Sequence, residues 1–233
     1  MIPPDLLDAA TAPYRQGGHF TYHFARGKLS RDPVFAFFLQ QGLIGQNAEV
    51  LDIGCGQGLM ASLLTAAANT THWPQGWPVA QTLKGYFGID LMPTDIARAT
   101  EALDHLSPRI RFALGDMCEC EFPPCDVVVI LDVLHYVPID AQNAVIDRAL
   151  AALRPRGRLL LRVGDERGGP GFVVSQWVDR IVTRIRGHRV TPTFCRPLAD
   201  WIELLQHKGL SVDASPMHKG TPFANVLLRA DKA

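Results

Sequence analysis

The chain has 233 residues, of which 47% are hydrophobic and 20% are charged, a balance typical of soluble globular proteins. Lys+Arg and Asp+Glu both total 23, so the formal net charge is +0, which argues against a protein dedicated to coating nucleic acid. A chain of this length can bury roughly 70% of its unfolded surface and needs neither disulfides nor a structural metal to fold. We expect a single domain over residues 1–233.

Cysteine usage and the N-terminus favour a reduced, cytoplasmic protein. Five cysteines without a secretory segment do not form the pattern of a disulfide framework, and the first residues lack the basic and apolar regions of a signal peptide. No apolar run approaches the ~20 residues of a membrane span. We therefore expect no membrane partner. No metal site is expected either, because Cys118, Cys120 and Cys125 lack the spacing of a zinc ligand pair.

Short apolar runs alternate with helical patterns through the middle of the chain. The expected strands are residues 49–54, 85–90, 109–114, 126–131 and 158–163, and the expected helices are residues 57–68, a helix from Pro93 through Leu106, and residues 139–153. The run Val127–Leu131 is uninterruptedly apolar, as in a strand buried on both faces of a parallel sheet. This alternation predicts an α/β sheet with helices on both faces.

The two ends of the chain differ from this pattern. Residues 1–45 are expected to form helices ahead of a core over residues 46–165. Residues 166–208 are expected to hold a glycine-rich loop and helices near residues 172–185 and 198–208. Residues 209–233 are expected to form a terminal strand pair, over 210–214 and 223–229. The segment 69–84 is longer than a typical connection, and either covers the ligand edge or decorates the surface.

Polar features follow the expected strands, where open parallel sheets bind ligands. The first is the loop Asp52–Gly58, whose glycines let the backbone turn sharply and approach a ligand closely. Its GxGxG spacing differs from the GxGxxG of dinucleotide folds, and a purely structural tight turn is the alternative. Asp90 closes the second strand, where it can bind ribose hydroxyls or cap the next helix. Asp116 follows the third strand, and Asp132, His135 and Tyr136 follow the fourth.

In this order, these features resemble the class I S-adenosylmethionine-dependent methyltransferases. The segments that carry the resemblance are VLDIGCGQG (Val50–Gly58), GID (Gly88–Asp90), GDM (Gly115–Met117), DVVVILDVLHY (Asp126–Tyr136) and LRPRGRLLLRVGD (Leu153–Asp165). The resemblance implies a Rossmann-like, doubly wound, seven-stranded sheet, mostly parallel with an antiparallel C-terminal strand and helices on both faces. It is loose over residues 1–45 and 166–208, which usually select the substrate in this family.

The resemblance also implies S-adenosylmethionine as cofactor and S-adenosylhomocysteine as product. The cofactor-binding residues it implies are Asp52, Gly54, Cys55 and Gly56 around the methionine part, Asp90 at the ribose, Leu91, Asp116 and Met117 at the adenine, and the backbone of Leu131 or Asp132 at the amino group.

Two groups of residues are candidates for the acceptor side. His135 is the candidate base for an oxygen or nitrogen nucleophile that must lose a proton, and Tyr136 is the next; the alternative is that His135 only packs against the cofactor. Within the N-terminal helices, the candidates to line an acceptor pocket are Tyr14, Tyr22 and His23, and the candidates to pair with a carboxylate are Arg26 and Lys28. An amphipathic helix packed on the sheet is the alternative for this stretch. A second basic cluster (Arg180, Arg184, Arg186, His188, Arg189 and Arg196) either attracts an anionic partner or is a solvated helix face.

The expected activity is methyl transfer to a small or carrier-protein-bound organic acceptor. Oxygen is the favoured acceptor atom because a histidine base is present, and carbon of an aromatic or polyketide-type intermediate is next. Nucleic acid is disfavoured because the charge is balanced and Leu131–Leu134 holds no Asn-Pro-Pro-Tyr-like motif. The alternatives are a non-catalytic module that binds the same cofactor and an NAD-dependent oxidoreductase, the latter disfavoured by the glycine spacing.

Overall fold

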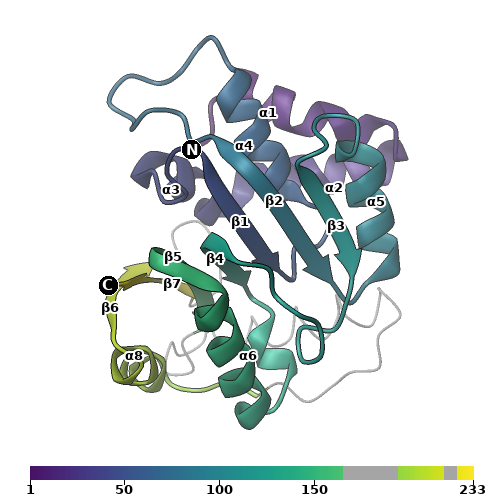
Figure 1. Ribbon diagram of the computed structural model, residues 1–233. Helices are drawn as coiled ribbons and strands as arrows, with labels where there is room; N and C mark the ends of the chain where they lie inside the picture. Colours follow the sequence, from purple (N-terminus) through teal and green to yellow (C-terminus); the bar gives the residue numbers. More distant parts are fainter. Residues whose placement is uncertain (165–193, 218–224) are drawn as a thin grey trace.

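The computed structural model describes residues 1–164, 194–217 and 225–233. They form one seven-stranded sheet with helices on both faces (Figure 1). The strands are β1 (Ala48–Ile53), β2 (Leu83–Asp90), β3 (Ile110–Leu114), β4 (Cys125–Leu131), β5 (Leu153–Gly164), β6 (Leu210–Pro216) and β7 (Asn225–Lys232). The helices are α1 (Pro4–Thr11), α2 (Gly18–Arg31), α3 (Pro33–Gln41), α4 (Leu59–Asn69), α5 (Pro93–Leu103), α6 (Ile139–Ala152) and α8 (Leu198–His207), with 3-10 turns η1 (Ala12–Arg15) and η2 (Leu134–Tyr136).

The strand order is β3-β2-β1-β4-β5-β7-β6. Strands β1 to β5 pair in parallel, and β7 is antiparallel to both β5 and β6. The chain winds outward in opposite directions from β1 and β4, and ligands bind at such a switch point, outside the carboxyl ends of the strands. The predicted fold class, mostly parallel with an antiparallel strand near the C-terminus, is confirmed.

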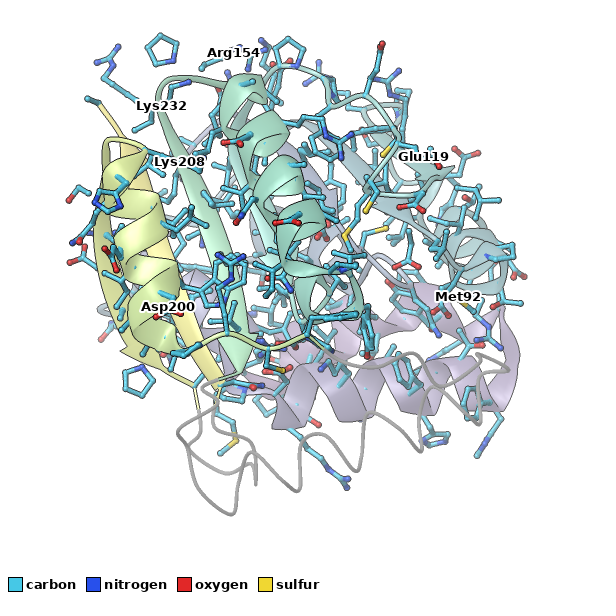
Figure 2. All side chains as sticks on the ribbon, turned by 90° about the horizontal axis from the view of Figure 1, so that it is seen from below. Met92, Glu119, Arg154, Asp200, Lys208 and Lys232 are labelled. Atoms are coloured by element: carbon cyan, nitrogen blue, oxygen red, sulfur yellow. The ribbon has the colours of Figure 1, made fainter. Side chains whose placement is uncertain are left out.

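The central strand β4 separates two apolar cores. Val127 and Val129 pack with residues from α1 to α5, whereas Val128 and Ile130 pack with residues from α6 and α8. All four side chains are buried, because successive residues of a strand point to opposite faces and both faces are covered. On the α6 face, Lys232 donates from Nζ to the carbonyl oxygens of Leu150 and Leu153, at 2.9 and 2.8 Å, at the end of α6 (Figure 2).

Several predicted boundaries differ from the structure, and two of these differences have a clear physical reason. Helix α5 ends at Leu103, so Leu106, expected on its apolar stripe, lies in the following turn and is 38% exposed. Strand β5 begins at Leu153 instead of Arg158, because Leu153 pairs with Cys125 before an irregularity in the β4–β5 register. Pattern reasoning places the ends of elements less well than their cores, because caps and tertiary pairing decide the ends.

The segment 69–84 does not reach the ligand edge of the sheet. It leads into the start of β2 and lies at the end of the sheet opposite the strand arrowheads (Figure 1). Gln81, which is 1% exposed, donates to the Phe38 carbonyl at 3.0 Å and accepts from the Ile44 amide at 2.7 Å. Of the two alternatives, covering the cofactor is therefore excluded, and the segment holds the chain between α3 and β1.

Several expectations fall on residues outside the described ranges. These are the helix near residues 172–185, the glycine-rich loop and the basic residues Arg180, Arg184, Arg186, His188 and Arg189. Among the helices that are described, none is long and apolar enough to cross a membrane.

Replacing Gln81 by Ala is expected to lower the free energy of unfolding by about 2 kcal/mol, because the buried Ile44 amide and Phe38 carbonyl lose their partner. Denaturant unfolding measures this change. Gln46→Ala is the matched control, since Gln46 bonds the same segment from an exposed position and should change stability by less than about 1 kcal/mol. Equal losses in the two variants would contradict the prediction.

Candidate active site

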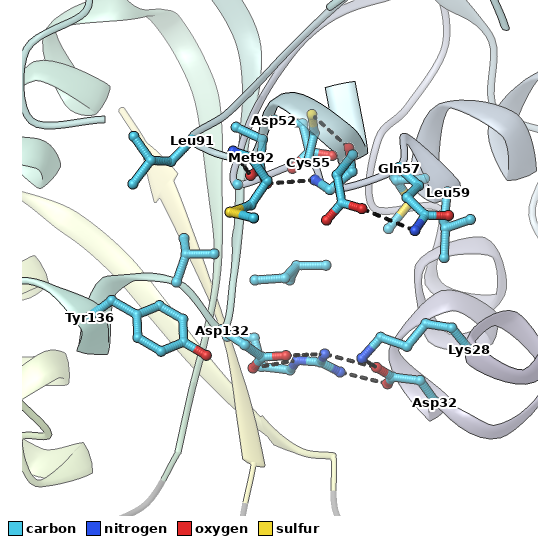
Figure 3. Close-up of a pocket in the computed structure, with 18 of the residues that line it drawn as sticks. Lys28, Asp32, Asp52, Cys55, Gln57, Leu59, Leu91, Met92, Asp132 and Tyr136 are labelled. Atoms are coloured by element: carbon cyan, nitrogen blue, oxygen red, sulfur yellow. Dashed lines mark hydrogen bonds and ion pairs between the residues drawn. The ribbon is translucent and has the colours of Figure 1, made fainter. Parts of the chain in front are cut away.

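A cavity of about 840 Å³ lies at the carboxyl ends of the parallel strands, between them and helices α2 and α3 (Figure 3). Its size is within the range of small-molecule sites. Most of the predicted site residues line it, although they come from distant parts of the sequence. They are His23, Lys28, Asp52, Gly54, Cys55, Gly56, Asp90, Leu91, Asp116, Met117, Leu131, Asp132, His135 and Tyr136.

Three predicted acceptor residues do not line this cavity. Tyr14 is fully buried and donates from its hydroxyl to the Gln57 carbonyl at 2.9 Å; burial raises the pKa of this phenol far above its usual value. Tyr22 contacts the Arg15 guanidinium, 5.2 Å from its ring centroid, and Arg26 forms an ion pair with Asp8. Tyr22 and Arg26 therefore interact within the N-terminal helices, whereas Tyr14 holds the glycine loop.

Helix geometry explains which residues of α2 reach the cavity. Positions three and four apart share a face of a helix, and His23, Gly27 and Arg31 accordingly line the cavity together with the adjacent Phe24 and Lys28. Sequence reasoning missed Arg31. Arg31 follows His23 by eight residues, a spacing that places both on one face of a helix, and this spacing could have identified it.

Glycine occurs at positions 54 and 56 of the Asp52–Gly58 loop for different structural reasons. Gly54 has φ +80°, and a Cβ there would lie 2.3 Å from Val133 Cγ1, so the loop after β4 excludes any side chain. Gly56 has φ +53° and open space around its missing Cβ, so its backbone is accessible from the cavity. Burial raises the pKa of the Cys55 thiol well above its usual value; this side chain is therefore a neutral packing group.

Asp90 joins the glycine loop to the start of α5. Its Oδ2 accepts from the Gly56 amide at 2.8 Å, and its Oδ1 accepts from the Met92 amide at 2.9 Å. Met92 is the N-cap residue of α5, so Asp90 holds the N-terminal end of α5. This agrees with helix capping, which is one of the two roles predicted for Asp90. A carboxylate oxygen can accept more than one hydrogen bond, so the Asp90 carboxylate is chemically suited to bind a hydroxyl group as well.

Asp52 is a buried acid behind the same loop. It is 4% exposed and accepts a hydrogen bond from the Tyr86 hydroxyl. Burial raises the pKa of Asp52 to about 7; the Tyr86 bond opposes this shift, and the charge of Asp90 adds to it. A cation in the cavity favours the ionised carboxylate, so this acid can respond to a positively charged ligand.

Asp116 and Met117 lie in a turn that α6 holds in place. Asp116 Oδ1 accepts from the Cys118 amide at 2.7 Å. Arg148 in α6 donates to the carbonyl oxygens of Met117 and Cys120, the latter at 2.9 Å, with its guanidinium 4.9 Å from the Phe122 ring centroid. Sequence reasoning missed Arg148, because it lies on a helix remote from this turn and belongs to no motif.

A buried network of charges forms the opposite wall. Arg162, with a side chain 2% exposed, donates to both carboxylate oxygens of Asp32 at 2.6 and 2.8 Å and to Asp132 Oδ1 at 2.9 Å. Lys28 pairs with Asp32 at 2.8 Å. Burial disfavours ionisation of Asp32, but Arg162 and Lys28 hold its pKa well below the usual value. Both oxygens of the Asp132 carboxylate thus accept hydrogen bonds from Arg162. The predicted cofactor contact would therefore be made by the Asp132 backbone.

The middle of the chain is similar to a known protein family. Residues 51–159 match the family model described as a methyltransferase domain. This segment is a methyltransferase domain. The predicted resemblance to class I S-adenosylmethionine-dependent methyltransferases is confirmed by this match together with the fold.

Two curated relatives share part of this methyltransferase sequence. A carboxy-S-adenosyl-L-methionine synthase of Chromohalobacter salexigens is 35% identical over 116 residues, which are 49% of this chain and only 39% of that protein's length. A ubiquinone biosynthesis O-methyltransferase of Xylella fastidiosa is 28% identical over 202 residues, which are 83% of this chain and 73% of that protein.

Among solved structures, the magnesium protoporphyrin IX methyltransferase of Synechocystis, with bound S-adenosylhomocysteine, has a TM-score of 0.61 and 18% identity. The match covers 98% of both chains. This likeness is one of fold.

The raised pKa of Asp52 predicts a pH dependence of stability. Between the ordinary carboxyl pKa of 3.8 and about 7, the unfolded chain ionises while folded Asp52 keeps its proton, so its contribution to stability falls as pH rises. Asp52→Asn has no carboxyl to titrate and therefore does not lose this stability. The difference in unfolding free energy, variant minus original chain, should rise by up to about 1.4 kcal/mol per pH unit in that window. Denaturant unfolding at pH 4, 5, 6, 7 and 8 measures the difference. A difference that stays constant over this range would show that Asp52 does not titrate with a raised pKa.

Proposed function

We propose that the chain transfers a methyl group from S-adenosylmethionine to an oxygen atom of a small organic acceptor. The observation that carries this proposal is the convergence of the Asp52–Gly58 loop, Asp90 and the Asp116–Met117 turn on one cavity of about 840 Å³. These are the segments expected to bind the cofactor, and they belong to a methyltransferase domain.

The residues present fit this cofactor. Gly56 offers an accessible backbone in a left-handed conformation, and the Asp52 and Asp90 carboxyls favour a cationic sulfonium nearby. Leu91 lines the cavity and is 60% exposed, so its side chain offers an apolar surface for an adenine ring. In the proposed arrangement Asp52, Gly54 and Gly56 surround the methionine part, Asp90 binds the ribose and Asp116 and Met117 flank the adenine.

The acceptor would lie on the side formed by α2 and η2. S-adenosylmethionine supplies a methyl group that is already activated, so the protein has to position the acceptor and take up its proton. His135 and Tyr136 line the cavity with ring centroids 4.1 Å apart, and His135 is the proposed base. His23 and Lys28 line the same cavity from α2.

Oxygen is proposed as the acceptor atom because a histidine lines the cavity and because the ubiquinone biosynthesis relative is named an O-methyltransferase. A carrier-bound acceptor would have to be recognised outside the cavity. Of the second basic cluster, the structure describes only Arg196, which is 8% exposed and bonds to Asn143 at 2.9 Å. A small molecule is the acceptor that we propose, and a carrier-protein-bound acceptor is the alternative.

Asp90→Ala is expected to weaken S-adenosylhomocysteine binding by about 1–3 kcal/mol, because charge-assisted hydrogen bonds to the ribose are lost. Calorimetric titration measures the affinity, with NADH as a second ligand. Asp104→Ala removes an exposed acid at the end of α5 and should leave the affinity unchanged. Unchanged affinity in a folded Asp90→Ala variant would show that Asp90 holds the glycine loop and α5 in place but does not bind the ligand.

The activity itself is tested with labelled S-adenosylmethionine and a panel of small phenols and hydroxy acids. For an acceptor that becomes methylated, His135→Ala is expected to lower kcat by about 10²–10⁴-fold, while S-adenosylhomocysteine affinity stays within about twofold. A rate that holds at every pH would remove His135 as the base. Binding of S-adenosylhomocysteine without turnover of any acceptor would favour the non-catalytic module, and tight binding of NADH alone would favour an oxidoreductase.

A further inference from the structure

The side of the cavity formed by α2 and β5 has an unbalanced charge. Among the described residues that line this side, three side chains are cations and two are carboxylates: Lys28, Arg31, Arg162, Asp32 and Asp132. The ion pairs of Asp32 with Lys28 and Arg162, and that of Asp132 with Arg162, can be followed in Figure 3. One positive charge is therefore left over on this side.

The charge in excess belongs to Arg31. Arg162 is bound by both carboxylates, and Lys28 lies 2.8 Å from Asp32. Arg31 is exposed in the last turn of α2, and no carboxylate in the described part of the chain pairs with its guanidinium. A cation that lines a cavity without a partner is available to a ligand anion. The planar guanidinium matches a carboxylate, which it binds through two parallel hydrogen bonds.

Gly27 leaves space beside Arg31 on the same face of α2. It lies four residues before Arg31, and both residues line the cavity. A Cβ at Gly27 would have no heavy atom of the described chain within 4 Å, so packing does not require glycine there. Glycine inside a helix is destabilising relative to alanine. A ligand that lies against this part of α2 gives the glycine a purpose.

The surface next to these residues is aromatic. Phe24 on α2, Phe35 on α3 and Tyr136 in η2 all line the cavity. Aromatic side chains pack favourably against another ring in offset or edge-to-face arrangements. This surface therefore suits the ring of an acceptor, whereas Arg31 suits a carboxylate attached to that ring.

We propose that the acceptor is an aromatic hydroxy acid whose carboxylate pairs with Arg31 while its ring packs against Phe24 and Phe35. The inference rests on the proposed function, for which it names the class of acceptor. One uncompensated cation matches one negative charge. The carboxylate does not react, so Arg31 holds the acceptor equally in the ground state and the transition state, and it determines KM more than kcat.

The test compares aromatic hydroxy acids with their primary amides, which have a similar shape and no charge. Calorimetry measures the binding of hydroxybenzoates, hydroxycinnamates and these amides to protein saturated with S-adenosylhomocysteine. The proteins are the original chain, Arg31→Gln and Arg109→Gln. Arg109 is the matched control, because it is exposed, directly precedes β3 at the opposite end of the parallel strands, and is not among the cavity-lining residues.

The original chain is expected to bind at least one acid about 10-fold or more tightly than its amide. Arg31→Gln should lower the affinity for this acid roughly 10- to 100-fold, as for a hydrogen bond to a charged group, and leave the affinity for the amide within about twofold. Arg109→Gln should change neither affinity. Acids that do not bind, acids that bind no better than their amides, or equal losses for both ligands overturn the inference. The comparison of acid with amide on the original chain does not depend on either variant.

The affinity of Arg31→Gln for S-adenosylhomocysteine distinguishes an acceptor contact from a cofactor contact. It should stay within about twofold of the original value, and for an acid that becomes methylated KM should rise while kcat changes less than about threefold. A loss of S-adenosylhomocysteine affinity as large as the loss for the acid would assign Arg31 to the cofactor's carboxylate and overturn the inference. Methylation of neutral phenols without binding of any acid overturns the inference and leaves the proposed function intact. Failure of the original chain to bind S-adenosylhomocysteine overturns the proposed function itself.

Discussion

The arrangement of the cavity depends on the ion pairs of Arg162. This guanidinium, buried on β5, binds Asp32 at the start of α3 and Asp132 after β4. Removing one partner of a buried ion pair typically costs about 3–5 kcal/mol, because the remaining charge stays buried. Asp32 also accepts from the Val34 amide at 3.1 Å and pairs with Lys28, so one carboxylate caps α3, connects to α2 and attaches both helices to the sheet.

The two sides of the cavity differ in charge as a consequence. The side formed by the strand ends and the glycine loop carries Asp52, Asp90 and Asp116. The side formed by α2 and β5 carries Lys28, Arg31 and Arg162 with Asp32 and Asp132. A cationic cofactor suits the first side, and its charge would favour the ionised form of Asp52, whose pKa burial raises to about 7. The second side leaves Arg31 without an ion pair among the described residues, next to the space assigned to the acceptor.

Close contacts from outside the loops hold the first side in shape. Val133, in the loop after β4, lies where a Cβ of Gly54 would be. Asp90 fixes the Gly56 amide, and Arg148 fixes the turn after Asp116 from the far face of the sheet. Each loop is therefore positioned by a partner from another element, so the cavity is preorganised for a ligand.

The sequence alone determined the sheet, the loops that line one side of the cavity and the family, because buried parallel strands and the loops that follow them have strong local patterns. The apolar run of β4, the glycine loop and the acids at the strand ends are such signals. Only the tertiary structure decided which of the candidate acceptor residues line the cavity. The side of α2 that faces the cavity, the hydrogen bonds between Asp132 and Arg162 and the role of Arg148 depend on how distant segments pack. Such contacts join residues far apart in the chain and leave no periodic pattern, which is why Tyr14, Tyr22 and Arg26 were assigned to a pocket that they do not line.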